Sequence, residues 1–260
     1  MNTLEVKMVN LLIDLRENYG AAEIKAEFET EASRMNELMR LKEIAERARL
    51  GLVIKIGGAE AITDMFEAQH LGITGLIAPM IESVYAMTKY LEAIQKYFPK
   101  DLRKGIHFGV NIETYQAFNN LKDILNVKLI NLIDTVTLGR VDMAGSLDLG
   151  RDELNSDKLF EIAHELFTLA KKKRLRTTMG GGIAKEAISY IKKLASKNLL
   201  NRFETRKVVF IVPKSFIKVE EGIIKANKFE LLWLENKRNY YKNIFHEDDT
   251  RIEMLKKRTK

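Results

Sequence analysis

Two stretches of this sequence decide the fold: Ile-His-Phe-Gly-Val-Asn-Ile-Glu at residues 106–113 and Asp-Thr-Val-Thr-Leu-Gly-Arg-Val-Asp at residues 134–142. Each is a short apolar run typical of a strand, each lies between helix-like segments, and each ends in an acid, Glu113 or Asp142. In a chain that repeats strand and helix, the strand ends collect on one face of the domain, where active sites are built. Two carboxylates on that face can hold one hard divalent cation, with water completing its coordination shell.

The composition fits one large α/β domain. The chain has 260 residues, of which 46% are hydrophobic, and this is enough for a sizeable core. It has no cysteine, which excludes disulfides, thiol catalysis and thiolate metal sites. No apolar run approaches the length of a membrane span and no signal peptide is visible, so we expect a cytoplasmic protein with no membrane partner.

The chain is basic, with a net charge of +7 and a pI near 9.3. Its basic residues are spread among acids instead of forming one arm, and no nucleic-acid recognition motif is present. We therefore expect a small anionic substrate as the partner of this surface, and no nucleic acid.

Strand-like and helix-like segments alternate along most of the chain. The strand-like segments are 21–27, 52–56, 74–80, 106–113, 134–140, 175–179 and 207–212, and the helix-like segments are 3–17, 31–49, 59–70, 83–97, 115–126, 157–173 and 184–195. Such alternation indicates parallel strands joined by helical crossovers. We therefore expect a (β/α)8 TIM-type barrel over residues 1–215, with its eighth strand reduced or replaced before residue 21. A doubly wound open sheet is the competing fold, although no Gly-x-Gly-x-x-Gly follows the first strand.

Residues 216–260 form a predicted helical extension of the barrel. Its long helix, over 216–242, is more apolar than a lone surface helix requires, since it contains Phe229, Leu231, Leu232, Trp233 and Tyr240. We expect this extension to pack on a partner subunit or across the barrel, and we expect the protein to be a homo-oligomer.

Four segments resemble the HpcH/HpaI aldolase and citrate lyase family, a set of metal-dependent barrels that act on oxo-acids. Residues 52–75 contain a strand that ends in a cation, then Asp64, Ala68 and a Leu-Gly pair before the next strand. Leu-Ile-Ala-Pro-Met-Ile-Glu-Ser at 76–83 is similar to the family's Val-Pro-Met strand. Asn-Ile-Glu-Thr at 111–114 is similar to its Ile-Glu-Thr segment, and Leu-Gly-Arg-Val-Asp-Met at 138–143 to its Gly-x-x-Asp-Leu segment.

The resemblance implies a divalent metal, Mg²⁺ or Mn²⁺, on Glu113 and Asp142. It also implies a pyruvate-like substrate that chelates this metal, with the backbone N–H groups of Val141 and Asp142 facing the substrate carboxylate and Met80 beside it. The chain departs from the family pattern in that Lys55 stands where the family has a strand-end arginine. In addition, the Glu-His dipeptide of the aldolase members has no counterpart, and the first strand is displaced by a helix.

Several further residues are candidates for the site. Lys55, at the end of a strand, can neutralise an enolate, pair with a phosphate or form a Schiff base, or it can form a salt bridge to Glu27, Glu29 or Glu82. The general base is open between Glu29 and a metal-bound water.

Two candidates lie on later strand ends. Gly180, Gly181 and Gly182 follow a strand and precede a helix, where free N–H groups bind anions or where a tight turn needs glycine. Arg140 is expected either to contact the acceptor half of a substrate or to pair with Asp142 or Asp148.

With these residues, the family resemblance implies a metal-dependent carbon–carbon lyase or aldolase that acts on a 2-oxo-acid or a related carboxylate through a metal-stabilised enolate. Two alternatives stay open from the sequence. One is a lyase of 3-hydroxyacyl-thioesters, as in the citrate lyase branch, and the other is a non-catalytic barrel that acts as a scaffold or ligand sensor.

Overall fold

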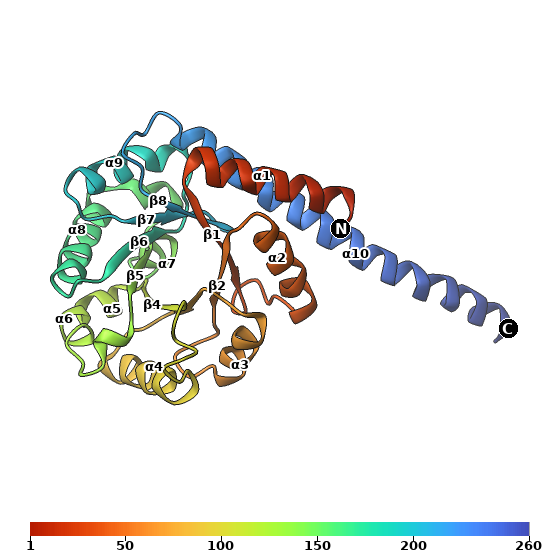
Figure 1. Ribbon diagram of the computed structural model, residues 1–260, viewed down its shortest axis with the longest axis horizontal. Coiled ribbons are helices and arrows are strands. Elements are labelled where there is room, and N and C mark those ends of the chain that lie inside the picture. Colours follow the sequence, from red (N-terminus) through yellow and green to blue (C-terminus); the bar gives the residue numbers. More distant parts are fainter. Residues whose placement is uncertain (260) are drawn as a thin grey trace.

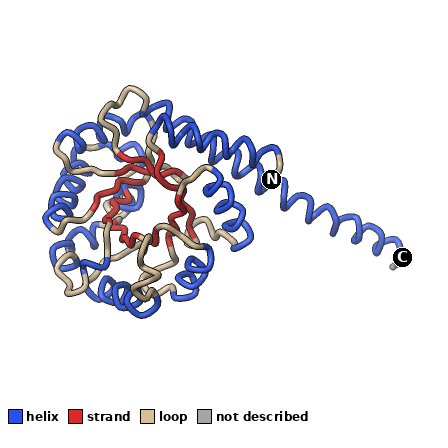
Figure 2. Tube along the Cα trace, viewed as in Figure 1, coloured by secondary structure: helices blue, strands red, loops and turns tan. Residues whose placement is uncertain are grey.

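The computed structural model describes residues 1–259 as a closed eight-stranded barrel surrounded by helices (Figures 1 and 2). The strands are β1 (Ala21–Glu27), β2 (Gly51–Lys55), β3 (Gly75–Ala78), β4 (His107–Ile112), β5 (Thr135–Gly139), β6 (Arg176–Gly180), β7 (Arg202–Glu204) and β8 (Val208–Ile211). The α-helices are α1 (Thr3–Tyr19), α2 (Met35–Arg47), α3 (Ile62–Leu71), α4 (Val84–Tyr97), α5 (Tyr115–Asn119), α6 (Leu121–Ile124), α7 (Arg140–Gly145), α8 (Asp157–Lys172), α9 (Ile188–Ser196) and α10 (Val219–Arg258). Three 3₁₀ helices, η1 (Ile130–Leu132), η2 (Arg151–Asn155) and η3 (Lys185–Ala187), complete the set.

The barrel is closed by a strand that runs against its neighbours. Strands β1 to β7 pair in parallel and in sequence order, whereas β8 is antiparallel to both β7 and β1. The predicted barrel is thus confirmed, and the open sheet is excluded by the closed strand order.

The predicted position of the eighth strand was wrong. It is β7, which has only three residues and one apolar side chain, Phe203, too short a run to give a strand signal. The segment before residue 21 is instead the helix α1. Because β7 and β8 form a hairpin, the turn at residues 205–207 lies at the same end of the barrel as the carboxyl ends of β1 to β6.

Charged side chains fill the amino-terminal end of the barrel interior. The carboxylate of Glu23 bonds Nε2 of His107 at 2.9 Å and Nη1 of Arg202 at 2.6 Å, and it accepts from the hydroxyl of Thr74 at 3.0 Å. Burial raises the pKa of Glu23, but His107 and Arg202 outweigh burial and lower that pKa to about 2. This ionic layer fills the barrel at the end remote from the predicted site.

The long helix α10 packs along α1, and its carboxyl-terminal part extends beyond the body of the barrel (Figure 1). Phe229 and Trp233 are buried inside this chain, so packing against the barrel body, and not a partner subunit, explains these two side chains. None of the helices described between residues 1 and 259 is long and apolar enough to cross a membrane.

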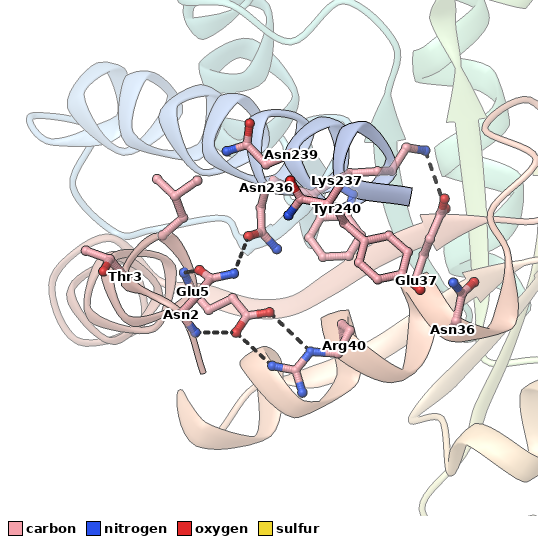
Figure 3. A pocket seen from close by; sticks show the side chains of 13 residues that line it. Asn2, Thr3, Glu5, Asn36, Glu37, Arg40, Asn236, Lys237, Asn239 and Tyr240 are labelled. Carbon is pink, nitrogen blue, oxygen red and sulfur yellow. Dashed lines mark hydrogen bonds and ion pairs between the residues drawn. The ribbon is translucent and has the colours of Figure 1, made fainter. Parts of the chain in front are cut away.

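Polar contacts tie α10 to the starts of α1 and α2 (Figure 3). They surround a crevice of about 590 Å³ at the point where α10 leaves the body. The amide of Asn2 donates to Oδ1 of Asn236 at 2.7 Å, and Lys237 pairs with Glu37 at 3.4 Å. The hydroxyl of Tyr241 also donates to Oε1 of Glu37 at 2.6 Å, so these contacts hold α10 in place up to about residue 241, and the helix continues past them.

Candidate active site

A cavity of about 450 Å³ opens at the carboxyl ends of the strands. Residues from the strand ends, from the loops that follow them and from α10 line it. They include Lys25, Glu27, Lys55, Asn111, Glu113, Thr137, Gly139, Val141, Asp142, Arg151, Gly180, Gly181, Gly182, Ile183, Glu204, Arg206, Asn227 and Glu230. The sequence-predicted residues Lys55, Glu113, Val141, Asp142 and Gly180–Gly182 are therefore brought together in one cavity.

Glu113 is the buried acid of this cavity, with only 2% of the residue exposed. Its Oε1 accepts a hydrogen bond from the backbone N–H of Met80 at 3.1 Å, and its Oε2 accepts one from the amide of Asn111 at 3.1 Å. Burial raises the pKa of Glu113, Lys55 opposes this effect, and the negative charge of Asp142 adds to it. Two hydrogen bonds thus fix a desolvated carboxylate whose charge interacts with that of a second acid.

Met80 acts on this site through its backbone. It is a non-glycine residue with φ of 50°, a left-handed conformation that costs of order 1–3 kcal/mol. Its N–H donates to Oε1 of Glu113. Met80 is 42% exposed and is not among the residues that line the cavity, so its backbone positions Glu113, and the substrate contact of Met80 stays a prediction.

Gly139 leaves the space that Glu113 occupies. A Cβ at this position would lie 2.4 Å from Oε2 of Glu113 and 2.8 Å from its Cβ. Asp142 follows three residues later, in the first turn of α7, and its side chain is exposed to the cavity. A glycine at the end of β5 therefore makes room for Glu113 in the cavity that Asp142 also lines.

The donor set fits a hard divalent cation. Among the described residues there is no cluster of three or more histidine, aspartate or glutamate side chains that would form an all-protein cage. Two carboxylates with water fit Mg²⁺, which usually keeps several waters and uses one or two carboxylates. A cation here would also offset the repulsion between Glu113 and Asp142.

Lys55 lies in the same cavity, held between two acids. Its Nζ is 2.6 Å from Oε2 of Glu29 and 3.6 Å from Oε2 of Glu27. Burial alone would lower the pKa of Lys55, but the carboxylates of Glu27, Glu29 and Glu113 outweigh burial and raise it. Lys55 is therefore a fixed positive charge, and Glu29, which does not line the cavity, is placed to hold it.

Arg140 lies beneath the cavity and not in it. It is fully buried, and its guanidinium donates to the carbonyl oxygens of Gly181 at 2.7 Å and Gly182 at 3.0 Å, and to that of Leu154 at 3.1 Å. Burial lowers the pKa of Arg140 to about 10. Arg140 forms no ion pair with Asp142 or Asp148 in the described residues, because its donors are used by carbonyl groups of two loops and by Oδ1 of Asn155. The contact of Arg140 with the acceptor half of a substrate stays a prediction.

Further acids and cations lie on the β7 side of the cavity, and of these the sequence patterns indicated only Glu27. Lys25 pairs with Glu204 at 2.6 Å, and Arg206 pairs with Glu31 at 3.1 Å and with Glu27 at 3.5 Å. The charged run at residues 203–207 was the available signal. This signal is weak, because β7 has only three residues and one apolar side chain and so does not mark the run as the end of a strand.

Comparisons with known proteins agree on one family. The family model for HpcH/HpaI aldolase/citrate lyase matches residues 11–180, and no curated protein sequence matches significantly. An HpcH/HpaI aldolase from Desulfitobacterium hafniense DCB-2 is 14% identical, with a TM-score of 0.60 over 76% of this chain and 81% of that chain. An HpcH/HpaI aldolase/citrate lyase family protein from Burkholderia cenocepacia J2315 is 13% identical, with a TM-score of 0.61 over 92% and 90%.

A third similar structure is the citrate lyase beta subunit from M. tuberculosis, complexed with oxaloacetate and magnesium. It is 12% identical, with a TM-score of 0.52 over 83% of this chain and 92% of that chain. At such identities these structures establish a shared fold.

The space at Gly139 gives a testable prediction. Gly139→Ala should lower the free energy of unfolding by about 1–3 kcal/mol, because the new methyl group overlaps the Glu113 side chain. Gly145→Ala in α7 is the matched control, since a Cβ there meets nothing within 4 Å. Urea unfolding of the metal-free proteins measures both changes, and equal effects of the two substitutions would contradict the close approach.

Proposed function

Because the chain belongs to the HpcH/HpaI aldolase/citrate lyase family, we propose that it cleaves or forms the carbon–carbon bond of a 2-oxo-acid with the help of a divalent metal ion. Membership of this family of carbon–carbon lyases makes the chain an enzyme and sets aside the scaffold or sensor alternative. The observation that supports the proposal most is the convergence of Glu113, Asp142 and Lys55 in one cavity at the strand ends.

Glu113 and Asp142 would hold the metal, Mg²⁺ or Mn²⁺. When bound, a divalent ion supplies Lewis-acid stabilisation of negative charge on the oxygens of a 2-oxo-acid. The similar citrate lyase beta subunit is complexed with oxaloacetate and magnesium, which supports the binding of a divalent metal together with an oxo-acid in the cavity of the present chain. Val141 and Asp142 line the cavity at the start of α7, and their backbone would lie beside the substrate carboxylate.

Lys55 contributes a fixed positive charge. Its ammonium group is held by Glu27 and Glu29 and interacts electrostatically with Glu113, so it lies near the place where negative charge develops during bond cleavage. A lysine that forms a Schiff base must first lose its proton, and neighbours that raise the pKa of Lys55 oppose that step. The charge role therefore fits this cavity better than the covalent role.

The metal proposal predicts a stability difference. Mn²⁺ at a hundred times its dissociation constant should stabilise the wild type by about 2.7 kcal/mol, since a ligand that binds only the folded state stabilises it by mass action. Glu113→Gln and Asp142→Asn should each abolish this gain while the barrel stays folded. The melting temperature with and without Mn²⁺ is the measurement.

Asp148→Asn is the matched control for that experiment. Asp148 is an exposed acid outside the cavity, and its positive φ of 56° is tolerated by asparagine. It should respond to Mn²⁺ as the wild type does. The same response to Mn²⁺ in all four proteins would rule out a metal on Glu113 and Asp142.

The charge role of Lys55 is tested by substitution and trapping. In metal-dependent release of pyruvate from a 4-hydroxy-2-oxo-acid, Lys55→Arg should retain appreciable activity because it keeps the charge, whereas Lys55→Met should lose it. Borohydride reduction in the presence of pyruvate should leave the mass of the protein unchanged. A reduced adduct on Lys55 would replace this role with imine chemistry.

We also propose that α10 joins this chain to a second copy of itself. Exposed apolar side chains lie at Leu231, Phe245 and Ile252, which are separated by fourteen and then seven residues with Arg238 at the intervening position, and Leu234 and Leu255 follow the first and third by three residues. Apolar residues spaced by multiples of seven lie on one side of a helix and are typical of helices that pair along one seam. A lone helix that projects into water gains little stability from propensity alone, so a partner helix would account for the length of α10.

The full chain should then be oligomeric by light scattering. Phe245→Glu with Ile252→Glu should reduce its mass, since charges in an apolar seam oppose pairing. Asn243→Glu with Thr250→Glu adds the same charges to exposed positions on the opposite side of α10 and should leave the mass unchanged. A monomeric wild type, or equal masses for the two double variants, would contradict the proposal.

A further inference from the structure

Three successive carbonyl groups point at one buried guanidinium. Arg140 donates to the carbonyl oxygens of Gly180 at 3.4 Å, Gly181 at 2.7 Å and Gly182 at 3.0 Å. In a trans peptide the C=O and the following N–H point in opposite directions. Because these carbonyls are directed toward Arg140, the N–H groups of Gly181, Gly182 and Ile183 are directed away from it.

The side away from Arg140 is the cavity. Gly180 to Ile183 line the cavity, whereas Arg140 does not. In the described part of the chain, no hydrogen bond is donated by the N–H of Gly181, Gly182 or Ile183. Successive N–H groups that converge on one side of a turn form a concave anion site.

The glycines are required for this arrangement. Gly181 and Gly182 have φ of 78° and 62°, a region that other residues rarely adopt. A Cβ on Gly181 would lie 2.7 Å from the backbone nitrogen of Val141, and a Cβ on Gly182 would lie 2.4 Å from a methyl group of Leu154. The loop is therefore pressed against the start of α7 and against η2.

Arg151, the first residue of η2, lines the cavity as well. Arg140 holds η2 and the glycine loop together, because it also donates to the carbonyl of Leu154 and to Oδ1 of Asn155 at 2.8 Å. The other cations of the cavity, Lys25, Lys55 and Arg206, are paired with glutamates: Glu27, Glu29, Glu31 and Glu204. Within residues 1–259, the side chain of Arg151 has no ion pair or hydrogen bond.

We propose that Arg151 and the N–H groups of Gly181, Gly182 and Ile183 form an anion subsite that binds a phosphate or carboxylate group at the end of the substrate remote from the reacting bond. The inference rests on the proposed function, since both sites share one cavity. Arg140 is the positioning residue of this subsite. A guanidinium fork and a set of N–H donors recognise the oxygens of either anion.

The test is calorimetric titration of the full-length protein with inorganic phosphate and, separately, with acetate. Arg151→Gln should weaken binding of the preferred anion at least about tenfold, the usual scale for a lost hydrogen bond to a charged group. Arg151→Lys should bind with intermediate affinity, because it keeps the charge and loses the fork. Tighter binding of phosphate or of acetate identifies the kind of anion.

Arg174→Gln is the matched control, an exposed arginine before β6, at the opposite end of the barrel. It should bind the anion as the wild type does. Binding of Mn²⁺ and pyruvate should be the same in wild type and Arg151→Gln, which separates this subsite from the metal site. No binding of either anion by the wild type, or equal affinity in wild type and Arg151→Gln, would overturn the subsite even where Mn²⁺ and pyruvate bind.

Discussion

The site depends on one carboxylate that has almost no contact with water. Glu113 is desolvated and lies near Asp142, so its charged form is opposed both by burial and by a like charge. Two hydrogen bonds, from the N–H of Met80 and the amide of Asn111, offset part of this cost and fix the direction of the carboxylate. A divalent cation would offset the rest of the cost of keeping Glu113 charged. An arrangement that is costly without a metal is therefore useful for a lyase that binds one.

Some of the surrounding charged residues position other residues of the site, and others face the cavity itself. Arg140 is buried beneath the floor and organises the glycine loop, and Glu27 and Glu29 hold Lys55. Such residues do not need to touch the substrate, because fixing the direction of a neighbouring dipole or charge is enough to prepare the cavity before binding. The remaining groups that face the cavity without an ion pair are then the ones available for a metal and for an anion.

Much of the fold and part of the site could be predicted from the sequence. The acids at the ends of β4 and β5 follow clear apolar runs, and parallel strand ends meet on one face, so Glu113 and Asp142 were expected to lie together and do line one cavity. The hairpin of β7 and β8 was not recognised, because β7 has three residues with one apolar side chain, which is too few to show the alternation of apolar and polar residues that marks a strand. The role of Arg140 was also out of reach, since most of its partners are backbone carbonyls, which no side-chain pattern reveals.

The most direct test of the account is a crystal structure of the protein with Mn²⁺ and oxalate, a stable mimic of a 2-oxo-acid. The account predicts one anomalous manganese peak coordinated by Glu113 and Asp142, with oxalate completing the coordination and Lys55 nearby. Manganese bound elsewhere on the molecule, or oxalate in the cavity with no metal beside Glu113, would contradict the assignment of this barrel as a metal-dependent lyase.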